Sequence, residues 1–225
     1  AASFNLPWGI TSDNVNHVAY VSDSINNRIR TINLLTNNVS TLATVSSPRG
    51  IVYHASGVLY ITGASIQKVV VATGAVSTIA AQSAIYWFLC VNSAGTLLST
   101  LLYATVGNTV VRVNTNGSGA VITLVAGTTT AGFVDGGGTD TYFNTPLGIA
   151  LNDEESTLFI ADSNNYRIGK APSHRWRCYV HRSPHPSRQD VAALSGLLLQ
   201  PARSAPSSFH RGGGIAAAND KTTSS

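Results

Sequence analysis

Charged side chains are scarce in this chain of 225 residues: Asp, Glu, Lys and Arg together make up 11%, against about a quarter in an average globular protein. Methionine is absent, and the two cysteines, Cys90 and Cys178, provide neither a disulfide framework nor a cysteine-rich metal site. Cys90 lies in an apolar stretch and is predicted to be a small buried hydrophobe. No apolar run reaches 18 residues, so no membrane span is predicted.

The formal charge of +4 is unevenly distributed along the chain. Residues 1–171 hold seven Lys and Arg against eight Asp and Glu, a net of −1, whereas residues 172–225 hold seven against two, a net of +5. The first part therefore lacks the basic surface that nucleic-acid binding requires. Nucleic-acid binding is expected, if anywhere, through the basic tail.

Gly, Thr, Ser, Asn and Val are abundant, which is typical of short strands joined by many turns. Four segments resemble one another. Each has an apolar run that includes an aromatic residue, then a small polar turn, then a second alternating run; the segments are residues 17–33, 57–72, 99–114 and 156–171. A repeat of this kind indicates stacked, near-equivalent units rather than one irregular domain.

A Pro-x-Gly-Ile signal precedes three of these segments: Pro7–Ile10, Pro48–Ile51 and Pro146–Ile149. A further strand-like piece follows the first three segments. One unit therefore reads as four strands over about 40 to 45 residues, the length of a propeller blade. Gly9, Gly50 and Gly148 lie where a strand begins near the axis of the predicted propeller. A missing side chain there allows two backbone segments to approach closely. Trp8 and Trp87 lie beside strand-starting apolar residues and are predicted to pack in the core.

Two polar motifs recur in the repeats: Asp23-x-x-Asn26-x-Arg28-Ile29 and Asp162-x-x-Asn165-x-Arg167-Ile168. They resemble the signature of NHL-repeat β-propellers, and residues 126–150 resemble the connector between blades of that family. The match covers residues 4–171 in about four units. It is strong in the first and fourth units, partial in the second and weak in the third.

The resemblance implies an all-β protein, a β-propeller with NHL-type four-stranded blades. The blades are expected at residues 7–47, 48–83, 84–127 and 146–171, with a connector at 128–145. Because NHL propellers commonly have six blades, the four units are expected to form an incomplete ring. The fourth unit is expected to stop without its outer strand or strands.

Residues 172–225 differ from the repeats in being rich in Pro, Ser, Arg and His. Strand alternation ends in the middle of a unit, with no linker before the change. The tail is therefore expected to be mostly irregular, as a disordered segment or a segment translated out of frame.

Asp23, Asn26, Arg28 and their counterparts Asp162, Asn165, Arg167 are the most prominent polar set. Because the set recurs between repeats, a structural role is favoured over a ligand site: Asp and Asn bond local backbone in turns, and Arg can bridge to a carboxylate. Asp135 and Asp140 in the connector could contribute to a Ca²⁺ site, but two carboxylates fall short of the six to eight oxygens that Ca²⁺ prefers. No cofactor is expected, and a turn-forming linker is favoured there.

His17 and His54 are the only histidines in residues 1–171, and no nucleophile motif is present. The favoured function is a non-catalytic binding or scaffold module whose partner is a protein or peptide bound on the loops of several blades. Two alternatives stay open: a propeller-type lyase or hydrolase with an axial metal, and RNA binding. Nothing in the sequence indicates a cellular compartment.

Overall fold

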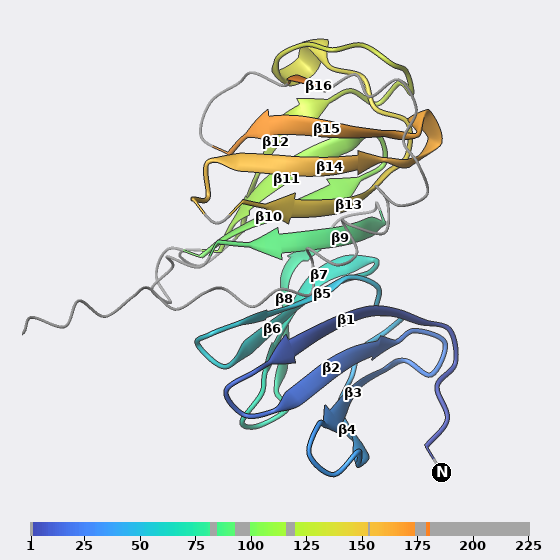
Figure 1. Ribbon diagram of the computed structural model, residues 1–225, viewed down its shortest axis with the longest axis vertical. Coiled ribbons are helices and arrows are strands. Elements are labelled where there is room, and N and C mark those ends of the chain that lie inside the picture. The colour runs from blue at the N-terminus through green and yellow to red at the C-terminus, as the bar shows by residue number, and fades with distance from the viewer. Residues whose placement is uncertain are drawn as a thin grey trace, which may run out of the picture.

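The computed structural model describes residues 2–81, 85–92, 100–115, 120–152, 154–173 and 179–180. These residues form four antiparallel sheets of four strands, each sheet in simple up-and-down order (Figure 1). The first sheet comprises β1 (Pro7–Asp13), β2 (Val18–Asp23), β3 (Arg28–Asn33) and β4 (Val39–Thr44). The second comprises β5 (Ile51–His54), β6 (Val58–Thr62), β7 (Ser65–Val70) and β8 (Val76–Ala81).

The third sheet comprises β9 (Tyr86–Val91), β10 (Leu101–Val106), β11 (Thr109–Asn114) and β12 (Val121–Gly127). The fourth comprises β13 (Pro146–Leu151), β14 (Thr157–Asp162), β15 (Arg167–Pro172) and β16 (Tyr179–Val180). Two short 3₁₀ turns also occur, η1 (Gly138–Asp140) in the connector and η2 (Ser163–Asn165) between β14 and β15. The all-β prediction with four-stranded units is confirmed.

The second strand of each of the first three sheets is mostly apolar and is buried along almost its whole length. Outer strands such as β4 and β8 are largely exposed. In the first three sheets burial is therefore highest in the second strand and falls toward the outer strand.

The hydrophobic core is divided into three clusters, each lying between two consecutive sheets. The cluster between the third and fourth sheets includes Cys90, Tyr103 and Ile149. Burial raises the pKa of the Cys90 thiol, which is 7% exposed, as predicted for a cysteine packed as a hydrophobe.

The inner strands β1, β5, β9 and β13 contact one another in that order. Among the described residues, β1 and β13 make no comparable contact, and Figure 1 shows the first and fourth sheets at opposite ends of the molecule. The four sheets therefore form an open arc, in agreement with the predicted incomplete ring.

The prediction that the fourth unit lacks its outer strand is wrong. The strand β16 pairs with β15 through Gly169–Val180 and Lys170–Tyr179 and completes a fourth four-stranded sheet. A two-residue strand carries no periodic pattern, and its ladder depends on backbone groups that any sequence supplies. The rest of the predicted tail, apart from the few residues directly after β15, lies outside the described residues.

Candidate binding surface

The residue between proline and glycine in Pro-x-Gly-Ile occupies the same place in every inner strand. This residue is Trp8 in β1 and Leu147 in β13; in the second sheet it is Arg49, which lies two residues before the first residue of β5. Register shows that Leu89 of β9 corresponds to Ile149, because Leu89 pairs with Ala104 as Ile149 pairs with Ile160. Trp87 is therefore the equivalent residue of the third sheet. The starts of β1, β9 and β13 lie on the right-hand side of Figure 1.

A register shift marks the start of three inner strands. It falls between Pro7 and Ile10 in β1, between Pro146 and Ile149 in β13, and at the equivalent end of β9. A β-bulge redirects the side chain that it contains and bends the strand. In an ordinary strand, successive side chains point to opposite faces of the sheet. The bulge changes the direction of the side chain between proline and glycine, so that it no longer follows this alternation.

Glycine is required where consecutive inner strands approach. A Cβ atom on Gly9 would lie 2.5 Å from the Arg49 carbonyl oxygen, and a Cβ atom on Gly50 would lie 2.8 Å from the Cα atom of Phe88. The prediction of close approach is confirmed at these two positions. At Gly148 the nearest atom would be 3.4 Å away, which is ordinary contact. The close approach brings Trp8, Arg49 and Trp87 together although they come from three sheets.

The Arg49 guanidinium lies against both indole rings. Its central carbon is 4.2 Å from the centroid of the Trp87 ring and 5.3 Å from that of Trp8. The two ring centroids are 5.9 Å apart, with planes inclined by 46°. This is a cation–π arrangement in which both aromatic faces stabilise one positive charge. We call Trp8, Arg49 and Trp87 the rim cluster.

The charge of Arg49 has no acidic partner among the described residues, where the one ion pair present joins Arg30 to Asp23. Within the same part of the chain, the Nη1 atom of Arg49 is buried and makes no hydrogen bond. A buried guanidinium nitrogen without an acceptor is destabilising. The rim cluster therefore holds a half-buried arginine, one of whose buried donors lacks an acceptor, against two aromatic rings.

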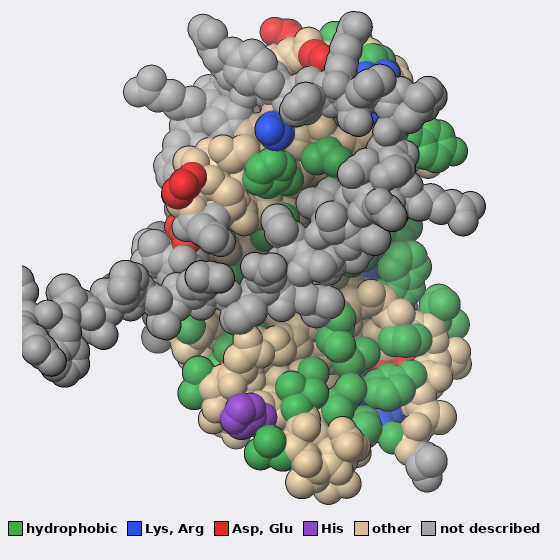
Figure 2. Space-filling model, in the orientation of Figure 1, with side chains coloured by type: hydrophobic (Ala, Val, Ile, Leu, Met, Phe, Trp, Pro, Cys, Tyr) green, Lys and Arg blue, Asp and Glu red, His purple; other side chains and the backbone are tan. Residues whose placement is uncertain are grey.

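The prediction that Trp8 packs in the core is wrong: 38% of its surface is exposed, and Trp87 is half-buried. Apolar neighbours at strand starts suggested burial, but the side chain of Trp8 lies within the bulge of β1 and against Arg49 and Trp87, at the edge where the inner strands begin. Figure 2 shows hydrophobic side chains gathered at this edge, over the starts of β1 and β9. The signal that could have identified the cluster was the shared repeat position of two tryptophans and an arginine.

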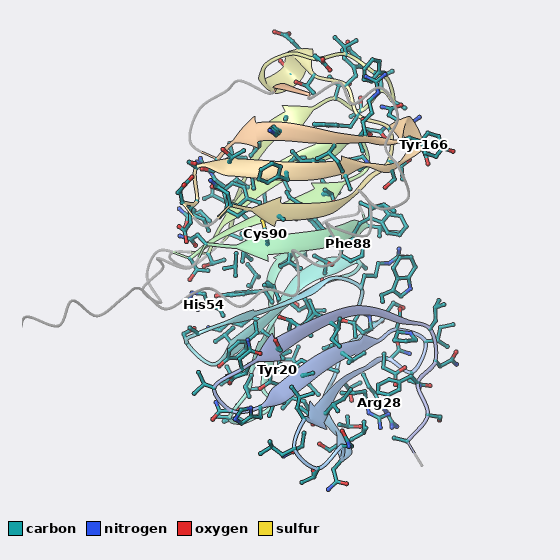
Figure 3. The ribbon with its side chains drawn as sticks, in the orientation of Figure 1. Tyr20, Arg28, His54, Phe88, Cys90 and Tyr166 are labelled. Carbon is teal, nitrogen blue, oxygen red and sulfur yellow. The ribbon has the colours of Figure 1, made fainter. Side chains whose placement is uncertain are left out.

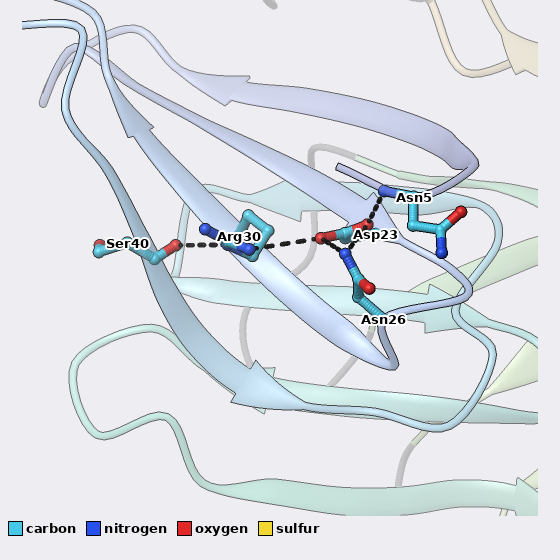
Figure 4. Close-up of polar contacts among 5 residues, drawn as sticks. All are labelled: Asn5, Asp23, Asn26, Arg30 and Ser40. Carbon is cyan, nitrogen blue, oxygen red and sulfur yellow. Dashed lines mark hydrogen bonds and ion pairs between the residues drawn. The ribbon is translucent and has the colours of Figure 1, made fainter. Parts of the chain in front are cut away.

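The recurring Asp/Asn motif lies in the turn between the second and third strands of a sheet (Figure 4). Asp23 is fully buried; it accepts hydrogen bonds from the Asn26 side chain (2.9 and 3.1 Å) and from the backbone N–H of Asn5 (2.8 Å). These bonds tie the segment that enters β1 to the turn after β2. The cation that pairs with Asp23 is Arg30, at 3.4 Å, whereas Arg28 is exposed and lies at the edge of the molecule in Figure 3.

The fourth sheet repeats the arrangement. Asp162 accepts hydrogen bonds from the backbone N–H of Asn144 and the side chain of Asn165, both at 2.7 Å. Burial raises the pKa of Asp162, although these hydrogen bonds and the nearby Arg167 act in the opposite direction. The Arg167 guanidinium lies 3.4 Å from the centroid of the Phe133 ring. The structural role of the six motif residues stays a prediction.

No protein-family model and no curated protein matches the chain. Solved structures do match, at low identity. An auxiliary nutrient binding protein from Bacteroides ovatus is 15% identical, with a TM-score of 0.68 over 81% of this chain and 48% of that chain. Its counterpart from Bacteroides thetaiotaomicron is 14% identical, with a TM-score of 0.65 over 80% of this chain and 48% of that chain.

A gluconolactonase from Xanthomonas campestris is 13% identical, with a TM-score of 0.58 over 80% of this chain and 62% of that chain. A chain of a nidogen/laminin complex is 15% identical, with a TM-score of 0.60 over 82% of this chain and 65% of that chain. The chain is a β-propeller. It spans about half the length of the two nutrient binding proteins. At such identities the likeness concerns the fold alone.

Among the described residues, no three His, Cys, Asp or Glu side chains are arranged to hold a metal ion. Asp135 and Asp140 are both exposed in the connector. His54 is 4% exposed, its Nδ1 accepts from the Ser56 backbone N–H at 3.3 Å, and burial lowers its pKa. No helix in the described part has the length and apolar character to cross a membrane.

Proposed function

We propose that this propeller is a non-catalytic binding module of the NHL type and that it binds a protein segment bearing a carboxylate at the rim cluster. The observation that carries the proposal is the environment of Arg49: two indole faces hold its guanidinium, and its buried Nη1 has no acceptor in the described part of the molecule. A carboxylate is the group best suited to such a donor, because a planar guanidinium can bind both of its oxygens.

The residue types of the rim cluster support a protein partner. Trp and Arg are the residues most enriched at energetic centres of protein interfaces. Exposed apolar side chains directly precede two of the strand starts: Leu6 is 55% exposed and Ile85 is 47% exposed. An apolar surround of this kind excludes water from a central polar contact and strengthens it.

The Asp/Asn motif is assigned a supporting role in this proposal. Asp23 and Asp162 are buried and already accept hydrogen bonds from the segments that lead into β1 and β13. Their carboxylates therefore have few free sites for a ligand. We assign them to holding the inner strands in place, so that the residues between proline and glycine keep their positions at the rim.

The test is a binding titration of the full chain with synthetic acetylated peptides rich in Glu and aromatic residues, against matched peptides with Gln in place of Glu. Calorimetry and tryptophan fluorescence report binding. A lost charge-assisted contact of about 1.5 to 3 kcal/mol should weaken binding of the acidic peptides by roughly 10- to 100-fold in Arg49→Gln. Arg49→Lys keeps the charge but loses the planar fork, and it should give an intermediate affinity.

The matched control is Arg28→Gln, which removes an exposed arginine from the motif turn of the first sheet. It should bind the acidic peptides as the unmodified chain does. Equal binding of Glu and Gln peptides, or equal losses in Arg49→Gln and Arg28→Gln, would overturn the proposal, as would the absence of binding to any peptide.

A further inference from the structure

One buried hydroxyl group joins two members of the rim cluster. Thr62, the last residue of β6, is 1% exposed. Its Oγ1 atom accepts a hydrogen bond from the backbone N–H of Gly50 at 2.8 Å and donates one to the backbone carbonyl of Trp87 at 2.9 Å. The backbone carbonyl of Thr62 accepts the N–H of Arg49 at 2.7 Å. Arg49 and Trp87 come from different sheets, yet both are hydrogen-bonded to this one residue.

The absence of a side chain at Gly50 makes room for this contact. A Cβ atom on Gly50 would lie 2.8 Å from Thr62 Oγ1 and 2.9 Å from the Trp87 carbonyl oxygen. The N–H of Gly50 also donates to that carbonyl oxygen, at 3.1 Å. The hydroxyl has a single proton, and the Gly50 carbonyl oxygen lies farther from Oγ1, at 3.3 Å. The Trp87 carbonyl is therefore the acceptor to which the Thr62 hydroxyl donates.

The position of Thr62 in the repeat carries a hydroxyl group in three of the four sheets. It lies two residues after the aromatic residue of the second strand, and it is occupied by Ser22, Thr62, Thr105 and Ala161. The Thr105 hydroxyl accepts from the N–H of Phe88 at 3.3 Å and donates to the carbonyl of Leu147 at 2.8 Å. In Figure 3 Phe88 lies at the start of β9. The peptide group between Trp87 and Phe88 is therefore held at its carbonyl by Thr62 and, through a longer bond, at its N–H by Thr105.

The first sheet has the hydroxyl group but not the hydrogen bond. Ser22 is fully buried, and its Oγ atom makes no hydrogen bond to any of the described residues. The acceptor equivalent to the Trp87 carbonyl would be the carbonyl of Arg49. The backbone of Arg49 is instead held from its own sheet, through the hydrogen bond to the Thr62 carbonyl. Thr62 therefore contributes to the position of two of the three rim residues.

We propose that Thr62 is a positioning residue of the rim cluster and that it determines the preference of the cluster for a carboxylate over a neutral amide. The inference rests on the proposed function, because it concerns the same surface. Thr62 does not contact the ligand; it fixes the separation of the two backbone segments that carry Arg49 and Trp87.

The preference follows from the orientation of the guanidinium. A guanidinium binds both oxygens of a carboxylate only when its plane is aligned with them, and a primary amide offers one oxygen in place of two. The Trp87 ring is the closer of the two indoles to Arg49, 4.2 Å from its central carbon, and supports this orientation. When the Thr62 hydroxyl is removed, the Trp87 carbonyl loses one of two donors, and the ring is held less firmly. The bidentate contact, which distinguishes a carboxylate from an amide, is then weakened.

The first test is made without a ligand. Thr62→Val keeps the shape of the side chain and removes the hydroxyl group, and Trp176→Phe in every sample leaves the two rim tryptophans as the only indoles of the chain. The circular dichroism of two coupled indoles depends on their separation and angle, here 5.9 Å and 46°. Thr62→Val should therefore change this signal, Thr105→Val should change it less, and Ser22→Ala should leave it as in the unmodified chain. Urea unfolding of each variant verifies that it is folded.

The second test uses the acetylated peptides with Glu or Gln that test the proposed function. In the unmodified chain, the ratio of the two affinities measures the preference for a carboxylate. Thr62→Val should lower this ratio by roughly 3- to 10-fold, the effect of one hydrogen bond. Thr62→Ser retains a hydroxyl group and should keep most of the ratio, and Ser22→Ala should keep all of it.

The possible failures can be told apart. If the unmodified chain binds Glu and Gln peptides equally, the proposed function fails, and the preference assigned to Thr62 fails with it; the circular dichroism still decides whether Thr62 positions the two indoles. If the chain prefers Glu peptides but Thr62→Val weakens binding of both peptides by the same factor, Thr62 has only a structural role. An unchanged indole signal in Thr62→Val, or equal changes in Thr62→Val and Ser22→Ala, would also overturn the inference.

Discussion

The segments that enter the first and fourth sheets are close copies in sequence, FNLPWGI at residues 4–10 and FNTPLGI at residues 143–149. Their backbones are also alike. The N–H of Asn5 donates to Asp23 at 2.8 Å, and that of Asn144 donates to Asp162 at 2.7 Å. In both segments the residue before proline has a positive φ, 51° and 53°. The local sequence therefore specifies the same local structure twice.

Burial, in contrast, differs sharply between the two copies. Phe4 is 37% exposed and Phe143 is 1% exposed. Phe143 packs in the cluster between the third and fourth sheets, together with Val110 and Ala126, whereas Phe4 belongs to none of the clusters between the described sheets. The shared sequence therefore specifies the hydrogen bonds of the two segments. The neighbouring sheet determines how far each phenylalanine is buried, and hence how much it stabilises the fold.

The largest effect that tests this comparison is the truncation of the two phenylalanines. Phe143→Ala should lower the free energy of unfolding by about 3 to 5 kcal/mol, because it opens a cavity in a closed junction. Phe4→Ala should cost less than about 1.5 kcal/mol, since the side chain is partly in water already. Urea unfolding followed by circular dichroism measures both. Equal losses would show that burial does not distinguish the two copies.

A second pair of variants compares the two buried carboxylates. Asp23→Asn should destabilise by about 3 kcal/mol, because it leaves the guanidinium of Arg30, which is 9% exposed, without its ion-pair partner. Asp162→Asn should cost about 1 kcal/mol, since burial already disfavours the charged form of Asp162 and Asn165 can bond to the new amide oxygen. Urea unfolding at neutral pH gives both values. A larger loss in Asp162→Asn would contradict this order.

The smallest effect is a difference in pH dependence between Asp13 and Asp162. Burial alone would raise the pKa of Asp13, but hydrogen bonds from the side chains of Asn16 and Tyr53 and from the backbone outweigh it, and its pKa is lowered from 3.8. Its contribution to stability is therefore present above 3.8 and is lost as the pH falls through the lower folded value. Because burial raises the pKa of Asp162, its contribution is present below 3.8 and is lost as the pH rises through the folded value.

Urea unfolding between about pH 3 and pH 6 should show these opposite signs. The stability difference between the unmodified chain and Asp13→Asn should grow in favour of the unmodified chain as the pH rises. The corresponding difference for Asp162→Asn should shift against the unmodified chain over the same interval. Slopes of the same sign in the two variants would show that the two carboxylates have similar environments.

Sequence reasoning succeeded where a property repeats along the chain. The alternation of Val, Ile, Tyr and Thr, with turns at regular spacing, predicted four-stranded units, and Gly9 and Gly50 were correctly placed at close contacts. It failed at β16, because two residues carry no periodic signal, and at Trp8, because a bulge overrides the alternation on which the prediction of burial depended.

The cation that forms an ion pair with Asp23 could not be predicted from the neighbouring sequence either. The sequence motif points to Arg28, which is adjacent in the turn, yet the cation within 3.4 Å is Arg30, two residues farther along β3. Alternate residues of a strand share a face, so both arginines were candidates. Only the packing of the segment before β1 over this face decides which of them is buried.

By itself the sequence determined the local conformations: the strands, their turns and the hydrogen bonds from Asn26 to Asp23 and from Asn165 to Asp162, which join residues near one another in the chain. It also marked Gly9 and Gly50, although the backbones that they approach belong to the next sheet. The tertiary structure alone decided which equivalent side chains are buried and which reach the surface. The burial of a side chain depends on the sheet that packs against it. Trp8, Arg49 and Trp87 form a cluster because three sheets bring the same repeat position to one place.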